Sequence, residues 1–193
     1  MKKHIALVEL ECAAGEFGLW QRYLLKGARF SVRVGVSLWD ILVVQFGLSP
    51  EYVEERVRTI FVNGCPVDDL HLAVVDDGAQ IALAGAMPGL VGVCMGRNSP
   101  VAGFRNEITY HAPDANPRPG EIVLKLFNTV ALEIGPKLLE WGILLDGRDL
   151  AQLVESFQDQ SKHWRVRVDG CDSECGALAR QEGLVRLRIA FVC

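Results

Sequence analysis

The sequence predicts an α+β protein with two domains, and three observations lead to this prediction. Several segments alternate polar and apolar residues with a period of two, which is typical of half-buried β-strands. Between them lie segments whose capping residues predict helices. Proline and glycine are concentrated in residues 96–120, which predicts a linker. We therefore expect one domain at residues 1–95 and a second α+β domain at residues 121–193.

The first domain is expected to place a helix between strands. Ser37 fits the N-cap of this helix and Gly47 fits its end. Asn63 and Gly64 form an Asn-Gly dipeptide, the strongest short signal of a β-hairpin. Strands are expected at residues 4–10 and 29–36, residues 58–68 are expected to be a strand that runs into this turn, and residues 74–84 are expected to be a turn followed by another strand. The order strand, strand, helix, strand, strand predicts a mixed sheet that begins with an N-terminal hairpin.

The second domain is expected to begin with a strand at residues 122–127. A helix is predicted at 129–141, and Pro136 inside it predicts a kink or two short helices. Asp149 fits the N-cap of the next helix. Two alternating segments, 164–168 and 185–191, predict the last strands.

Three motifs follow one another between residues 60 and 92. They are Phe61-Val62-Asn63-Gly64, Asp77-Gly78 before a strand, and Met87-Pro88-Gly89-Leu90-Val91-Gly92. This series resembles the ubiquitin-like β-grasp sulfur carriers, the family of molybdopterin-synthase small subunits and thiamine sulfur carriers. The resemblance implies that residues 1–95 form a β-grasp domain, in which a helix crosses one face of a mixed sheet.

The chain departs from this family at the tail. The carriers end in a free Gly-Gly, whose terminal carboxylate is converted to a thiocarboxylate. Here about 100 residues follow Gly92, and an internal peptide carbonyl cannot be activated as a terminal acid. We therefore expect a non-catalytic accessory or protein-interaction protein, linked to sulfur transfer or to molybdenum- or tungsten-cofactor enzymes. The alternative is a sulfur-carrier precursor that is processed near Gly92.

The segment at the tail position is apolar and rich in glycine. It is either buried between the two halves of the chain or offered to a protein partner, and burial is the favoured interpretation. In the second case it would be a partner-binding site. The candidate residues are Met87, Pro88, Gly89, Leu90 and Gly92.

Four arginines form two pairs in the last two predicted strands. They are Arg165, Arg167, Arg186 and Arg188. Residues two apart in a strand share a face, so neighbouring strands would gather four guanidinium groups into a site for an acidic partner or an anionic ligand. The alternative is a solvated sheet face with acidic neighbours such as Glu182.

The six cysteines are expected to be reduced, because a chain of this size and apolar content does not need disulfides. Cys171 and Cys175 would share one face of a helix and could bind zinc or act as a redox pair. A zinc site needs two more ligands, which only folding could supply, from Cys193, Glu174 or His163. The alternative is two unlinked thiols in a loop. No other cofactor is predicted.

Composition and motifs exclude several functional classes. The net charge of −4 argues against nucleic-acid binding. No apolar stretch approaches the ~20 residues that span a bilayer, and the N-terminus lacks the apolar core of a signal peptide, so a cytoplasmic protein is expected. We find no nucleophile elbow, phosphate-binding loop or dinucleotide motif, and therefore expect no enzymatic activity.

Overall fold

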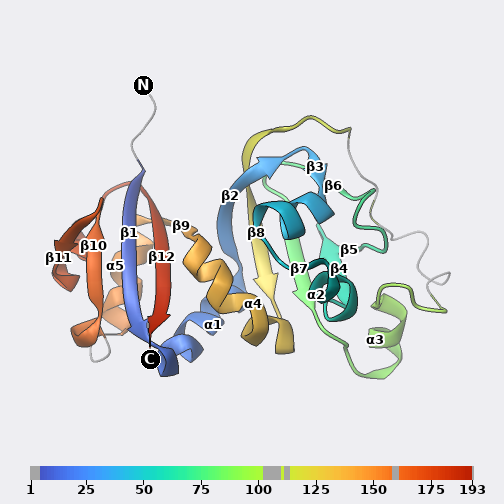
Figure 1. The fold of residues 1–193 in the computed structure, drawn as a ribbon, viewed down its shortest axis with the longest axis horizontal. Helices are drawn as coiled ribbons and strands as arrows, with labels where there is room; N and C mark the ends of the chain where they lie inside the picture. Colours follow the sequence, from blue (N-terminus) through green and yellow to red (C-terminus); the bar gives the residue numbers. More distant parts are fainter. Residues whose placement is uncertain (1–4, 102–109, 111–113, 158–160, 193) are drawn as a thin grey trace. The chain divides into compact units, whose positions relative to one another are not determined.

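The structure, a computed structural model, describes residues 5–101, 110, 114–157 and 161–192. It confirms the predicted α+β class (Figure 1). The chain forms two units: unit 1 combines Met1–Arg22 with Pro136–Cys193, and unit 2 is Tyr23–Gly135. The chain leaves unit 1 within helix α1 (Phe17–Lys26) and returns to it within helix α4 (Asn128–Trp141).

The sheet of unit 1 joins the first strand to the last three. Its strand order is β11-β10-β1-β12-β9 (Figure 1). Strand β1 (Ala6–Ala13) pairs in parallel with β12 (Leu184–Val192) and antiparallel with β10 (Arg165–Val168). Strand β11 (Cys171–Ser173) extends the sheet beyond β10, and β9 (Ile143–Asp146) pairs with β12.

One side of this sheet belongs to a hydrophobic core. Val8, Leu10 and Cys12 alternate along β1 and are buried. Three aromatic residues of the core, Trp20, Phe157 and Trp164, have ring centroids 5.7–6.0 Å apart. The helical segments of this unit include α5 (Gly147–Ser156) and the 3-10 helix η5 (Cys175–Arg180), both after β9 in sequence.

The sheet of unit 2 has the strand order β2-β8-β7-β4-β5. Strand β2 (Ala28–Val34) pairs antiparallel with β8 (Arg118–Leu126), and β8 pairs in parallel with β7 (Gln80–Ala84). Strand β4 (Thr59–Val62) lies between β7 and β5 (Cys65–Pro66) and is antiparallel to both. The predicted Asn-Gly turn connects β4 to β5, and both of its residues have positive φ, as such a turn requires.

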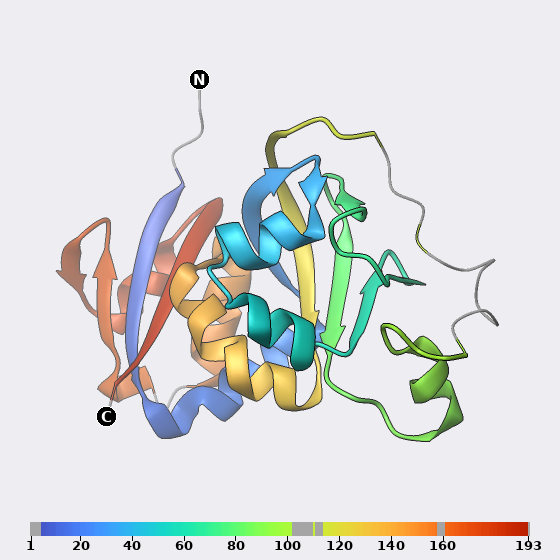
Figure 2. The same cartoon turned by 45° about the vertical axis from the view of Figure 1, so that its right-hand side comes forward.

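Two helices follow β2 and lie over one face of this sheet in both views (Figures 1 and 2). The first is a π-helix, η2 (Asp40–Gln45), and the second is α2 (Pro50–Glu55). The Ser37 hydroxyl accepts a hydrogen bond from the Asp40 amide at 3.1 Å, but Trp39 and not the predicted Ser37 occupies the N-cap position of η2. The two-residue strands β3 (Val36–Ser37) and β6 (Val74–Val75) form a second, small sheet.

Two sequence predictions about chain organisation differ from the structure. The first two strands do not form a hairpin, since β1 pairs within unit 1 and β2 pairs with β8. The physical reason is that α1 separates them, whereas hairpin loops usually have two to five residues. For the same reason the units do not follow the predicted bounds of 1–95 and 121–193, and residues 118–120 of the predicted linker belong to β8.

Helix α4 is continuous across Pro136, where the sequence predicts a kink or two short helices. None of the helices in the described part of the chain has the length and apolar character that a bilayer crossing would need.

Candidate binding surfaces

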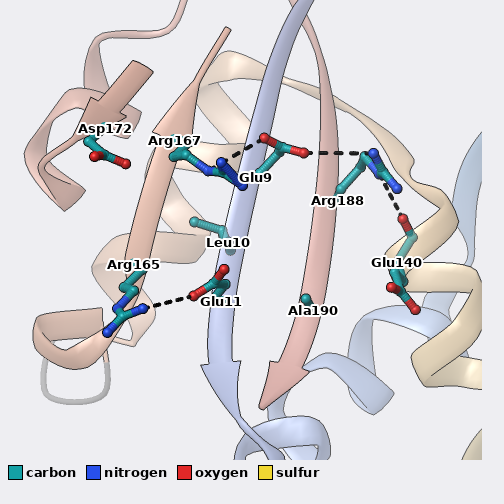
Figure 3. Close-up of a pocket in the computed structure, with 9 residues that line it drawn as sticks. All are labelled: Glu9, Leu10, Glu11, Glu140, Arg165, Arg167, Asp172, Arg188 and Ala190. Carbon is teal, nitrogen blue, oxygen red and sulfur yellow. Dashed lines mark hydrogen bonds and ion pairs between the residues drawn. The ribbon is translucent and has the colours of Figure 1, made fainter. Parts of the chain in front are cut away.

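The four predicted arginines lie on the unit 1 sheet, but their strands are not neighbours. Strand β1 lies between β10 and β12, and it places Glu9 between two of the arginines (Figure 3). The Glu9 carboxylate is 3.8 Å from Nε of Arg167 and 3.7 Å from Nη1 of Arg188. A second carboxylate, that of Glu11, is 3.7 Å from Nη1 of Arg165.

Charges therefore alternate across this face, which we call the charged face. Asp172 on β11 is the register partner of Arg167, so Asp172, Arg167, Glu9 and Arg188 form one row across four strands. The residues line a hollow of about 350 Å³ that contains both signs of charge. Cross-strand pairs of opposite charge stabilise a sheet by roughly 0.2–1 kcal/mol each. This arrangement differs from the predicted cluster of guanidinium groups, because β1 contributes compensating carboxylates.

The remaining arginine has a different partner. The Arg186 guanidinium carbon lies 5.6 Å from the centroid of the Trp141 ring, a cation–π geometry.

A signal for the charged face exists in the sequence: Glu9 and Glu11 alternate with Leu10 with the same period as the arginines. The sequence suggested acidic neighbours such as Glu182 for the arginines. In the structure, Glu9 and Glu11 of β1 take this role.

The two cysteines of the predicted metal or redox site lie in different local structures. Cys171 is exposed on β11, whereas Cys175 begins η5 and its thiol donates a hydrogen bond to the Ser161 carbonyl at 3.2 Å. Burial raises the pKa of the Cys175 thiol. Cys171 belongs to a strand and only Cys175 to a helix, so the spacing does not place both thiols on one helical face.

Within the described ranges, no group of three or more His, Cys, Asp or Glu residues is placed to hold a metal ion. Cys193, a candidate ligand, lies outside them. Burial raises the pKa of a further thiol, Cys12, to about 12, so this thiol remains protonated at neutral pH.

The segment at the carrier-tail position forms a short helix, α3 (Gly89–Met95). Gly92 is buried in this helix, and a Cβ atom on it would lie 2.2 Å from the Met87 carbonyl oxygen, so only glycine fits there. The Gly92 carbonyl accepts a hydrogen bond from the Gly96 amide at 3.1 Å. The site at which a carrier precursor would be cleaved is therefore part of a folded helical turn.

Helix α3 presents apolar side chains to solvent. Leu90 is 77% exposed and Val93 is 51% exposed, and the helix contains no charged residue. Pro88 and Gly89 are also exposed. The favoured expectation was burial between the two halves of the chain, and the exposure of these residues differs from it. The glycines that are buried, Gly85 and Gly92, allow close backbone approach while the larger side chains face outward.

A buried arginine that the sequence assigns to the linker fixes the chain after α3. Arg97 is 6% exposed, and its Nη1 donates to the carbonyls of Val53 at 3.0 Å and Val57 at 3.2 Å. Its Nη2 lies 3.1 Å from the Glu54 carboxylate, and its Nε donates to the Asp68 carbonyl at 3.3 Å. The guanidinium thus occupies the C-terminal end of α2, where helix carbonyls lack partners within the helix.

An apolar groove of about 670 Å³ crosses the unit 2 sheet. Ala82 and Ala84 on β7 line it together with Phe61 on β4 and Phe127 after β8, and Met87 also borders it. The even-numbered residues of β7 line the groove, as strand alternation requires. Ile81 also borders it, although the side chains of Ile81 and Leu83 are fully buried. The sequence prediction missed this groove, although the alternation of alanine with larger residues in Gln80–Ala84 was a visible signal.

Comparisons with protein-family models, with characterised proteins and with solved structures found no match to this chain.

Proposed function

We propose that this chain is a non-catalytic interaction protein that is built on a circularly permuted β-grasp scaffold and binds a protein partner through helix α3. The scaffold is unit 2, and α3 follows its strand β7. The two parts of the proposal, scaffold and partner surface, rest on separate observations.

The topology of unit 2 supports the scaffold. A β-grasp sheet combines an antiparallel hairpin, a helix that crosses one face, and further strands. Unit 2 has an antiparallel pair, β2 and β8. Two helices follow β2 and the two-residue strand β3, and the strands β4, β5 and β7 come after them. The difference is that β8 follows the other strands in the chain instead of preceding β2. Such a rearrangement is a circular permutation, which folds tolerate when the new connections run through surface loops.

The exposed apolar side of α3 is the observation that carries the proposed partner binding. Leu90 and Val93 are three residues apart, so they share one face of a helix without charged residues. Exposed apolar patches mark interaction sites. The helix is also held in place: Gly92 packs against the Met87 carbonyl and the buried Arg97 follows. A preformed apolar helix loses little conformational freedom on binding. From the sequence resemblance, we place the partner among proteins of sulfur transfer or of molybdenum- and tungsten-cofactor enzymes.

The test compares partner capture by wild-type protein and two variants in lysate of the native host. Leu90→Asp with Val93→Asp places two charges on α3, whereas Leu72→Asp places one at another site where the wild-type leucine is 72% exposed. We expect the α3 variant to recover at least about tenfold less of the same partner. The reason is that the loss of two apolar contacts at an interface lowers the binding free energy by ~1.4 kcal/mol or more. Equal recovery by the α3 variant and the Leu72 variant would refute the proposal.

The rival carrier precursor is tested separately by intact mass spectrometry of protein from the native host. Full-length protein alone agrees with an interaction protein. A fragment that ends at Gly92 would support processing and would require α3 to open first, since Gly92 lies inside it.

A further inference from the structure

The apolar groove of unit 2 contains a buried hydroxyl that lacks a hydrogen-bond partner. Thr59 is 1% exposed, and its Oγ1 has no partner among the described residues. Thr59 and Met87 each line both the groove and a neighbouring cavity of about 220 Å³, so they form the partition between the two. Because an unpaired hydroxyl is costly to bury, a ligand that offers Thr59 a hydrogen-bond partner would be favoured here.

The groove also contains one positive charge. The Lys125 side chain lines it, and its ammonium has a long hydrogen bond of 3.5 Å to the Gln80 side chain. Among the described residues no carboxylate lies within ion-pair distance of this ammonium. An anionic group in the groove would therefore complement Lys125.

The strand register fixes how these two polar groups are separated. Lys125 pairs with Ala82, which pairs with Phe61, and Thr59 is two residues from Phe61 on the same strand. The Lys125 ammonium reaches the side chain of Gln80, whereas Thr59 pairs with Ala84, four residues further along β7, so the two polar groups lie toward opposite ends of the groove. One small group cannot reach both, so the matching ligand has a polar group at each end and an apolar body between them.

The groove favours a small molecule over a peptide. It lies on the face of β4, β7 and β8, and each of these strands is paired on both sides. It therefore offers no sheet edge to the backbone of a peptide, whose N–H and C=O groups would lose water without gaining partners. An aromatic or aliphatic body carries no such groups. The volume and the apolar lining fall in the range of small-molecule sites.

We propose that this groove binds a small amphipathic acid with a hydroxyl group at its far end. The carboxylate lies at Lys125, the apolar body lies on Ala82 and Ala84 between Phe61 and Phe127, and the hydroxyl bonds Thr59 after the flexible Met87 side chain has moved aside. This site goes beyond the partner surface on α3 and does not depend on it.

Three probes test the proposal on the full chain. They are 3-(4-hydroxyphenyl)propionate, 3-phenylpropionate without the hydroxyl, and 4-ethylphenol without the acid. Binding is followed by backbone amide shifts in two-dimensional NMR, up to about 5 mM because small fragments reach roughly millimolar Kd. We expect the hydroxy acid to bind most tightly and to shift the amides of Ala82, Ala84 and Lys125. The absence of shifts at these residues would overturn the proposal.

Variants then separate the two polar contacts. Thr59→Val should weaken the hydroxy acid by about 2- to 10-fold and leave phenylpropionate unchanged, since it removes one neutral hydrogen bond. Thr59→Ser should restore binding. Lys125→Gln should weaken both acids by about 5- to 10-fold but not 4-ethylphenol, because it removes a charged donor. Lys162→Gln removes a charge in unit 1 and is the matched control.

The NMR spectra report at the same time whether each variant is folded. If Thr59→Val weakens binding of both acids equally, the ligand hydroxyl does not contact Thr59. If Lys162→Gln weakens binding as much as Lys125→Gln, the ligand carboxylate does not lie at Lys125.

Discussion

Replacement of Arg97 by alanine removes a guanidinium group that holds three backbone carbonyls and one carboxylate. Two of the carbonyls, those of Val53 and Val57, lie at the C-terminal end of α2. They would lose their side-chain donor in a part of the structure where Arg97 itself is only 6% exposed. The Glu54 carboxylate is affected less, because that side chain is 47% exposed and water can replace the lost partner.

The expected cost follows from these contacts. A buried acceptor left without a partner costs about 1–3 kcal/mol, and water that enters the vacated volume recovers part of it. With two buried carbonyls and little from the exposed ion pair, we expect Arg97→Ala to lower the free energy of unfolding of unit 2 by about 3 kcal/mol. Arg97→Lys keeps the charge but loses the planar fork, so it should cost about half as much.

The assay is urea unfolding followed by the amide signals of unit 2 residues, which assigns the transition to the unit that contains Arg97. Arg58→Ala is the matched control, because its side chain is exposed and only its backbone carbonyl bonds the Arg97 amide, at 2.7 Å. The loss should persist in high salt, since buried contacts are screened little. An effect of Arg97→Ala no larger than that of Arg58→Ala would refute the reasoning.

Four further predictions concern single sites. Thr59→Val should raise the free energy of unfolding of the ligand-free protein by about 1 kcal/mol in urea titrations, because it removes an unpaired buried hydroxyl. Gly92→Ala should increase hydrogen exchange across α3, because its Cβ has no room; unchanged exchange would contradict this packing. Iodoacetamide should label the exposed Cys171 in folded protein but Cys12 only after unfolding, as peptide mass spectrometry would show. Hydrogen bonds from Arg56 and Tyr52 lower the pKa of Glu133. Wild type should therefore be more stable than Glu133→Gln at neutral pH, and this difference should vanish as the pH falls through the lowered pKa. A stability difference that grows in acid would contradict this prediction.

Local patterns predicted most elements but not their partners. The alternation of residues 164–168 and 185–191 was sufficient for β10 and β12, and the Asn-Gly dipeptide was sufficient for the turn between β4 and β5. Strand β1 pairs over eight positions with β12, a strand that begins only at Leu184. No periodicity near β1 carries that information, because pairing is decided by the whole core.

For the candidate surfaces too, the sequence predicts which residues are present but not which residues they contact. The arginines were found by their spacing, but the strand between them supplies the carboxylate of Glu9, so the charge of the face could not be predicted from the arginines alone. Arg97 lies in a segment of turn-forming residues, and its burial depends on carbonyls of α2 about 40 residues earlier in the chain. The apolar sequence of α3 favours burial, although its leucine and one of its valines are exposed in the structure.

The parallel pairing of β1 with β12 has a consequence for synthesis on the ribosome. Unit 2 is continuous in sequence and can fold as it emerges, whereas β1 must wait for strands that begin only at Arg165 and Leu184. At about 5–20 residues per second this delay lasts roughly 10–30 s. During that time β1 is an unpaired strand, and Glu9 and Glu11 then provide the charge that keeps such strands from pairing with another nascent chain. The carboxylates that neutralise the arginines in the finished sheet thus also protect the strand before its partners exist.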